Sequence, residues 1–275
     1  MPFSDFVLLT PKNDEESLMI VRIAEAAKIP MVVSAQPHGA KLEREPAVLD
    51  RLRKANPAAR RVVIVEIPGP ETEGVLREAG YDVAVIDHHR YTELDRMTDK
   101  SSLEQFLEMF GIDEAMLATL GFDPVLVRGV GIIDRGFLWA LRNEIPDVET
   151  RKRIRDFYRS LALELGKDRA RIEEAAQEAW EHREVRDGVV IVRTDRNDVS
   201  IRDAVSFLIA DAYDAPPQSI VVEGTRRLFV QESDHAAALF QEYGGFTFGR
   251  DRCWGIQGTP EKPLPAVDEI LAKVA

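Results

Sequence analysis

Short apolar runs alternate with amphipathic segments over the first third of the chain. Four runs have the length and character of buried strands, and they lie at residues 5–9, 29–35, 62–65 and 81–86. Helical spacing separates them, most clearly over residues 16–28, and further helices are predicted over 49–54 and 72–80. Strands that alternate with helices predict an α/β fold, in which a parallel sheet is flanked by helices.

The pattern changes in the second half of the chain. Residues 98–120 have helical spacing, and residues 126–141 fit a helix or another buried segment. The strongly charged stretch that follows predicts one or two connecting helices. Beyond it we expect strands from residue 188, a helix over 200–213, a hairpin over 219–233 and a last helix over 267–275. The predicted organisation is a first α/β domain over 1–147, a helical linker over 148–186 and a second, smaller α/β domain over 187–275.

Polar side chains follow every predicted strand of the first sheet. They are Asp14 and Glu16 after the first strand, His38 after the second, Glu66 after the third, and Asp87, His88 and His89 after the fourth. In open parallel sheets, ligands bind beyond the carboxyl ends of the strands. We therefore expect these side chains to converge at one edge of the sheet.

The triplet Asp87-His88-His89 carries the clearest chemistry. Imidazole nitrogen suits Mn, Fe and Zn, and carboxylate oxygen suits Mg and Mn. A site with both kinds of ligand suits two-metal phosphoryl transfer, in which one ion generates hydroxide and both neutralise charge on the phosphorus oxygens. The alternative is that an Asp-His pair caps the next element, because short triplets recur by chance.

The acidic motifs around the triplet resemble those of the DHH superfamily of phosphoesterases. In that family an Asp-x-Asp follows the first strand, an aspartate ends a later strand, the triplet comes next, and a segment of the form GIxxDTGxF supplies another aspartate. At comparable separations this chain has Asp14-Glu15-Glu16, then Glu66 ending VVIVE, then the triplet, and then Asp134 in GIIDRGF. The resemblance covers residues 5–140.

The resemblance implies a metal-dependent phosphodiesterase or phosphoesterase that acts on a small nucleotide, a short oligonucleotide or a cyclic dinucleotide. It implies one or two Mn²⁺ or Mg²⁺ ions. The candidate metal ligands are Asp14, Glu16, Glu66, His88 and Asp134. The catalytic candidates are Asp87, His88 and His89, of which the first and last would orient the ligands or contact the phosphate.

Three positions depart from the family pattern. Thr10 stands in place of a histidine, and Glu16 and Glu66 stand in place of aspartates. Each exchange of Asp for Glu adds a methylene, which moves an oxygen by about 1.5 Å on a fixed backbone. The site then holds two metals with adjusted geometry, holds one, or has lost hydrolysis and keeps only its pocket. His38 either replaces the missing histidine or is a turn residue.

The C-terminal part resembles DHHA1, a domain that follows many DHH domains and helps to bind substrate. DHHA1 ends in a glycine-rich GGGHxxAAG segment, and residues 243–258 here keep glycines but lack the histidine. Arginine grips phosphate bidentately, and glycine lets a backbone approach a ligand closely. The substrate-binding candidates are therefore Arg90, Gly244, Gly245, Arg250 and Arg252. The alternatives are a glycine turn, solvated arginines, and a salt bridge from Arg90 to a carboxylate such as Glu93 or Asp95.

Composition narrows the partners of this 275-residue chain. A net charge of −12 gives no overall attraction for a nucleic-acid backbone, so we expect small anionic substrates and no long nucleic acid. Cys253 is the only cysteine, which excludes an intramolecular disulfide and a four-cysteine zinc site. We see no signal peptide and no stretch that would span a bilayer. We expect a cytoplasmic protein without a membrane partner, and a homodimer stays open.

Two interpretations from other classes stay open beside the enzyme. A catalytically impaired protein with the DHH fold would bind nucleotides, or regulate, without metal or turnover. A structural or interaction protein would show neither nucleotide binding nor metal uptake. Tight metal uptake with turnover distinguishes the enzyme from both.

Overall fold

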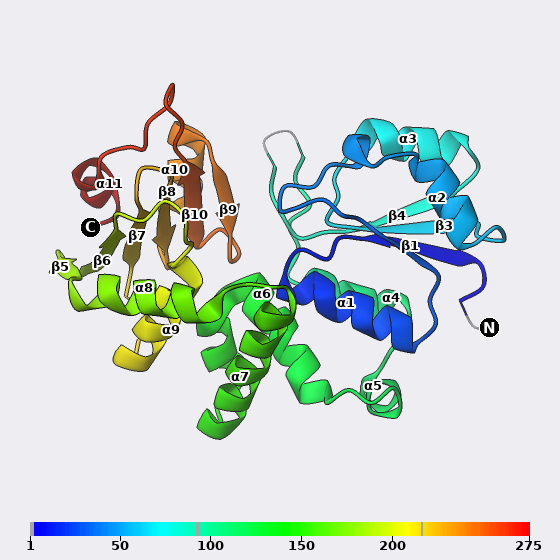
Figure 1. The fold of residues 1–275 in the computed structure, drawn as a ribbon, viewed down its shortest axis with the longest axis horizontal. Coiled ribbons are helices and arrows are strands. Elements are labelled where there is room, and N and C mark those ends of the chain that lie inside the picture. Colours follow the sequence, from blue (N-terminus) through cyan, green and yellow to red (C-terminus); the bar gives the residue numbers. More distant parts are fainter. Residues whose placement is uncertain (1–2, 92–93, 216) are drawn as a thin grey trace. The chain divides into compact units, whose positions relative to one another are not determined.

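The computed structural model describes residues 3–91, 94–215 and 217–275 (Figure 1). The chain divides into two compact units, each with its own sheet. The first unit comprises Met1–His88, Arg96–Asp134 and Asp147–Gly166, and the second comprises His89–Asp95, Arg135–Pro146 and Lys167–Ala275. Within the described residues, no helix combines the length and the apolar character needed to cross a membrane.

A wholly parallel sheet in the order β2-β1-β3-β4 forms the centre of the first unit. Its strands are β1 (Phe6–Thr10), β2 (Met31–Val33), β3 (Arg61–Val65) and β4 (Asp82–Ile86). The connections contain α1 (Glu15–Ala26), the 3-10 helix η1 (Leu42–Arg44), α2 (Val48–Ala55) and α3 (Pro70–Glu78). The strands coincide with the apolar runs of the sequence, which confirms the predicted parallel sheet.

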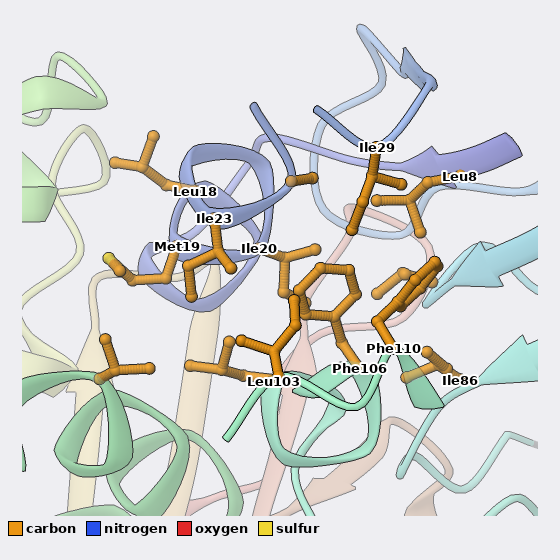
Figure 2. Packing of buried hydrophobic residues seen from close by; sticks show 14 of the residues in the cluster. Leu8, Leu18, Met19, Ile20, Ile23, Ile29, Ile86, Leu103, Phe106 and Phe110 are labelled. Carbon is orange, nitrogen blue, oxygen red and sulfur yellow. The ribbon is translucent and has the colours of Figure 1, made fainter. Parts of the chain in front are cut away.

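Both faces of this sheet are buried because its central strands are apolar at successive positions. Side chains along a strand alternate between the two faces. Val63 and Val65 of β3 pack with α1 and with α4 (Ser102–Met109), whereas Val62 and Ile64 pack with α2 and α3. Figure 1 shows these helix pairs on opposite faces of the sheet, and Figure 2 shows residues of α1 and α4 meeting in one core.

Further helices follow the sheet of the first unit. They are α4, α5 (Glu114–Thr119), α6 (Pro124–Glu144) and α7 (Val148–Glu164). The helical stretch predicted over 98–120 forms two helices because Ser101 and Asp113 each accept a backbone N–H three residues later and so cap a new N-terminus. The α6 helix is interrupted at Phe137, whose φ of 60° and ψ of −160° are not helical.

The charged stretch over 148–186 forms α7 and a second helix, α8 (Arg169–Glu181). The chain turns between them at Gly166, which has a φ of 74°. Glycine adopts this left-handed conformation without the steric cost that a side chain would add. The α7 helix belongs to the first unit and α8 to the second.

A mixed sheet in the order β5-β6-β7-β8-β10-β9 forms the centre of the second unit. Its strands are β5 (Glu184–Arg186), β6 (Val189–Thr194), β7 (Ser219–Glu223), β8 (Arg227–Gln231), β9 (Phe246–Phe248) and β10 (Cys253–Gln257). Its helices, besides α8, are α9 (Arg202–Ala212), α10 (Ala236–Tyr243) and α11 (Val267–Val274). Clusters with α8 and α9 on one face and with α10 and α11 on the other enclose the sheet. The predicted fold class, a parallel α/β domain, linking helices and a smaller α/β domain, is confirmed.

A candidate metal centre in the first unit

Four side chains from separate parts of the sequence meet at the carboxyl edge of the first sheet. They are Glu16 from the first turn of α1, Glu66 directly after β3, His88 shortly after β4, and Asp134 from α6. One ligand atom from each lies within 4.8 Å of the others. The sequence predicted all four as metal ligands, and the structure brings these four together.

His88 is in contact with two of the carboxylates. Its Nε2 atom lies 2.8 Å from Oδ2 of Asp134 and 3.2 Å from Oε1 of Glu66. The side chain of His88 is only 8% exposed, so little water screens these charges. One imidazole therefore links two acids in a partly desolvated site.

The N-terminus of α4 donates hydrogen bonds to two carboxylates of the cluster. The backbone N–H of Leu103 donates to Oε1 of Glu16 at 2.9 Å, and the hydroxyl of Ser102 donates to Oε1 of Glu66 at 2.7 Å. The N-terminus of a helix favours negative charge because its first N–H groups lack intrahelical partners. The start of α4 thus fixes two carboxylates from separate parts of the chain, Glu16 in α1 and Glu66 after β3.

The Glu66 backbone is left-handed, with a φ of 49°. Residues with a side chain rarely adopt this conformation, and at functional sites it aims a side chain that regular structure would point elsewhere. Here it follows immediately after the last residue of β3, Val65. The turn directs the Glu66 carboxylate to Ser102 and His88.

Burial and mutual repulsion raise the pKa values of the acids. Burial is the main cause that raises the pKa of Glu16 well above its usual value, and the charges of Asp134 and Glu66 add to it. Burial likewise raises the pKa of Asp14 to about 6, again with contributions from Glu66 and Asp134. Burial lowers the pKa of His88, but hydrogen bonds to Asp134 and Glu66 outweigh it and raise that pKa well above its usual value. The cluster therefore retains protons near neutral pH.

The donor set fits a divalent cation. Three carboxylates and one imidazole match the ligand preferences of Mn²⁺, and the oxygens also suit Mg²⁺. Within the described residues, the buried Oε2 atom of Glu16 accepts no hydrogen bond. A buried oxygen of this kind requires an explanation such as an ion, and a cation at this place would also remove the repulsion among the acids.

Asp14 lies beside the cluster but outside the set of four. Its Oδ1 atom accepts the backbone N–H of Ser17 at 2.8 Å and so caps α1, while Oδ2 lies 3.9 Å from Nδ1 of His38. The His38 side chain is 69% exposed. The sequence predicted Asp14 as a metal ligand; in the structure it caps α1 beside the four candidate ligands, and metal binding by Asp14 stays a prediction.

The other two residues of the triplet, Asp87 and His89, make different contacts. Asp87 is buried, and its backbone carbonyl accepts a hydrogen bond from Nε2 of Gln105 at 3.0 Å. His89 opens the segment 89–95, which is grouped with the second unit, and its ring centroid lies 6.2 Å from that of Tyr91. Neither residue belongs to the four-residue cluster.

Arg90 pairs with carboxylates inside the second unit. Its Nε atom lies 3.1 Å from Asp95, and Nη1 lies 2.5 Å from Asp251. Of the two carboxylates expected to pair with Arg90, Asp95 does so, and Glu93 lies outside the described residues. A phosphate at Arg90 would have to compete with two acidic partners.

The other substrate-binding candidates have structural neighbours that account for them. A Cβ atom on Gly245, whose φ is 89°, would lie 2.2 Å from the carbonyl oxygen of Gly255. The Gly244 carbonyl accepts the indole N–H of Trp254 at 2.8 Å. Arg252 pairs with Asp234 and Glu232, and the exposed Arg250 has a φ of 56°. Binding of substrate by these four residues stays a prediction.

The contribution of α4 was not among the predicted site residues. Its start carries a signal that sequence can reveal, because Ser101 and Glu104 form a capping box of the form S-x-x-E. That signal locates a helix N-terminus, but it does not say that the next two residues meet Glu66 and Glu16.

Comparisons with known proteins give likenesses of fold only. No protein-family model and no curated protein matches the sequence. A crystal structure of the exonuclease RecJ bound to manganese is similar, with 14% identity, a TM-score of 0.44, and coverage of 92% of this chain and 85% of that one. The pGpG-specific phosphodiesterase PggH from Vibrio cholerae is similar too, with 11% identity, a TM-score of 0.42, and coverage of 97% and 96%. At this level of likeness, the assignment of a function rests on the residues of the chain itself.

Proposed function

We propose that the protein is a metal-dependent phosphoesterase of the DHH type that hydrolyses a phosphodiester or phosphoanhydride in a small nucleotide. The observation that carries this proposal is the cluster of Glu16, Glu66, His88 and Asp134, whose ligand atoms lie within 4.8 Å of one another. These residues come from the positions that correspond to the acidic motifs of the family. The second unit is the DHHA1-like domain of this proposal.

The exchange of aspartate for glutamate at two positions is compatible with a metal site. The longer side chains of Glu16 and Glu66 reach the N-terminus of α4, where Leu103 and Ser102 donate hydrogen bonds to them. Outer hydrogen bonds of this kind orient ligands and tune their basicity. Of the three outcomes open for the site, this favours retained metal binding, and four ligands in one group favour a single ion.

The chain's own residues would act through position and charge. A bound Mn²⁺ or Mg²⁺ would supply a Lewis acid that lowers the pKa of water and neutralises phosphate charge. Glu66 and Asp134 would hold the ion, with His88 as a neutral nitrogen ligand between them. Glu16, the most buried of the acids, would complete the set from the side of α1.

A small substrate agrees with the charge of the chain. A net charge of −12 opposes binding along a polyanion, whereas one divalent cation reverses the sign of a small site. Short oligonucleotides and cyclic dinucleotides are therefore the proposed substrates. Location in the cytoplasm and a homodimer stay predictions, as do the domain boundaries.

The test is Mn²⁺-dependent hydrolysis of bis-p-nitrophenyl phosphate, followed by a panel of dinucleotides, with wild type, Glu66→Gln and Asp134→Asn. Glu45→Gln is the matched control, because Glu45 is also buried but pairs with Arg51 and lies outside the four-residue cluster. We expect turnover in wild type and the control and its loss in both site variants. Nucleotide binding without metal or turnover would instead support the catalytically impaired protein.

A further inference from the structure

The α6 helix is interrupted three residues after Asp134. Phe137 has a φ of 60° and a ψ of −160°, which a residue with a side chain rarely adopts. The residue is nonetheless only 9% exposed, and the guanidinium of Arg202 lies 5.1 Å from its ring centroid. Such a conformation persists only where the surrounding contacts stabilise it. Contacts that stabilise the break at Phe137 therefore also affect the position of Asp134, three residues earlier.

An ion pair spans the break. Nη1 and Nη2 of Arg135 donate to the two carboxylate oxygens of Glu144 at 2.7 and 2.6 Å. In an unbroken helix these residues, nine positions apart, would be separated by about 13.5 Å along the axis and would face opposite sides. The pair can form only in the broken helix, and a bidentate pair fixes the orientation of both partners. The Arg135 side chain is 6% exposed, which limits screening by water.

Close packing fixes the part of α6 that precedes Asp134. Gly131 lies one turn earlier, and a Cβ atom there would lie 2.7 Å from the hydroxyl of Ser101, the N-cap of α4. Gly129 lets α6 approach α7 in the same way, because its Cβ atom would lie 2.3 Å from Ile154. Asp134 itself stands in the last turn before the break, where a helix frays most readily.

We propose that the Arg135–Glu144 pair is the positioning device that holds Asp134 in place for the metal ion. This inference rests on the proposed function, since Asp134 is one of its proposed ligands. Arg135 directly follows Asp134, so the pair fixes the backbone on which the ligand stands. Arg135 and Glu144 are positioning residues, and neither belongs to the four-residue cluster.

Two variants separate positioning from electrostatics. Arg135→Gln removes a positive charge next to a proposed cation ligand, so Coulomb's law alone predicts tighter binding of Mn²⁺. Glu144→Gln removes a negative charge and by the same law predicts weaker binding. If the pair positions Asp134, both variants bind Mn²⁺ about tenfold more weakly, the loss typical of an outer partner of a metal ligand. Arg135→Lys, which keeps the charge but not the bidentate geometry, falls between them and wild type.

The measurement is the Kd for Mn²⁺ by isothermal titration of the full chain, well below the melting temperature of every variant. Arg227→Gln is the control, because Arg227 pairs at 2.6 Å with the buried Glu223 in the same unit as Glu144. We expect it to lower the melting temperature without changing the Kd. Wild-type binding with an unchanged or tighter Kd in Arg135→Gln overturns the positioning role alone. A wild type that binds no Mn²⁺ overturns the proposed function and this inference with it.

Discussion

The imidazole Nε2 atom of His88 lies 2.8 Å from Oδ2 of Asp134, and the same atom also contacts Glu66, so a protonated His88 is a counterion to both acids. Without a metal, a proton on His88 neutralises part of the negative charge of the cluster, which is why its pKa is raised. In the proposed function a divalent cation would supply that charge instead. Metal and protons would then compete for the same four side chains.

The first prediction concerns proton release. Glu16 and His88 have raised pKa values, and that of Asp14 is about 6, so protons bound near neutral pH must leave when Mn²⁺ binds. We expect affinity for Mn²⁺ to increase as the pH rises from about 5 to about 8. Titration calorimetry in buffers of different ionisation enthalpy measures the protons released per ion. Affinity that does not depend on pH would contradict the assigned ligands.

The second prediction concerns the stability of the metal-free protein. The folded pKa of Asp14, about 6 against 3.8 for the free side chain, means that its protonated form stabilises the fold at low pH. This contribution is lost as the pH rises through about 6. Asp14→Asn cannot titrate, yet its amide oxygen can still cap α1. Relative to the variant, wild type should lose stability as the pH rises from 3.8 to about 6, the two pKa values of Asp14, in denaturant titrations with a chelator. A constant difference between the two proteins would refute this.

The third prediction concerns the start of α4. Ser102→Ala removes the hydroxyl that donates to Glu66 at 2.7 Å. We expect Mn²⁺ affinity to fall about tenfold, because Glu66 loses the partner that orients it, while circular dichroism shows an intact fold. Ser160→Ala is the control, since the Ser160 hydroxyl donates to a backbone carbonyl of α7 and should leave the affinity unchanged. Equal affinities in all three proteins would show that the Ser102 hydroxyl does not orient Glu66 for the metal.

The fourth prediction tests whether a close backbone contact is what requires glycine at position 245. In Gly245→Ala, the new Cβ atom would meet the Gly255 carbonyl at 2.2 Å, and the φ of 89° is unfavourable as well. We expect unfolding free energy to fall by about 3 kcal/mol or more. Gly39→Ala has a similar φ of 80° but open space around it, so about 1 kcal/mol is expected. Similar losses in denaturant titrations would show that the close contact with Gly255 is not what requires glycine.

The course of the first sheet follows from local pattern. Apolar runs such as Val62 to Val65 are long enough to predict a strand that is buried on both faces, and the carboxyl ends of parallel strands lie on one edge. That is why Glu66 and His88 were expected near each other. Asp134 depended on the family resemblance, because nothing in the spacing of α6 indicates where its side chain points.

Other features depend on contacts between residues distant in the sequence. Asp14 caps α1 through Ser17, a role that only the backbone conformation decides. The hydrogen bond from Leu103 to Glu16 joins residues 87 positions apart. The Arg135–Glu144 pair requires a break in α6 at Phe137, and the one proline of that helix, Pro124, lies at its start and does not indicate the break. Local propensity carries no information about such contacts, since tertiary packing creates them.

The most direct test of the metal centre is the loss of the free Mn²⁺ electron paramagnetic resonance signal when metal-free protein is added. Wild type is predicted to remove one equivalent of Mn²⁺ per chain near pH 7.5, a pH above the value of about 6 for Asp14. Asp134→Asn should leave most of the signal, and Glu45→Gln should behave as wild type. An undiminished signal with folded wild-type protein would contradict the proposed metal centre.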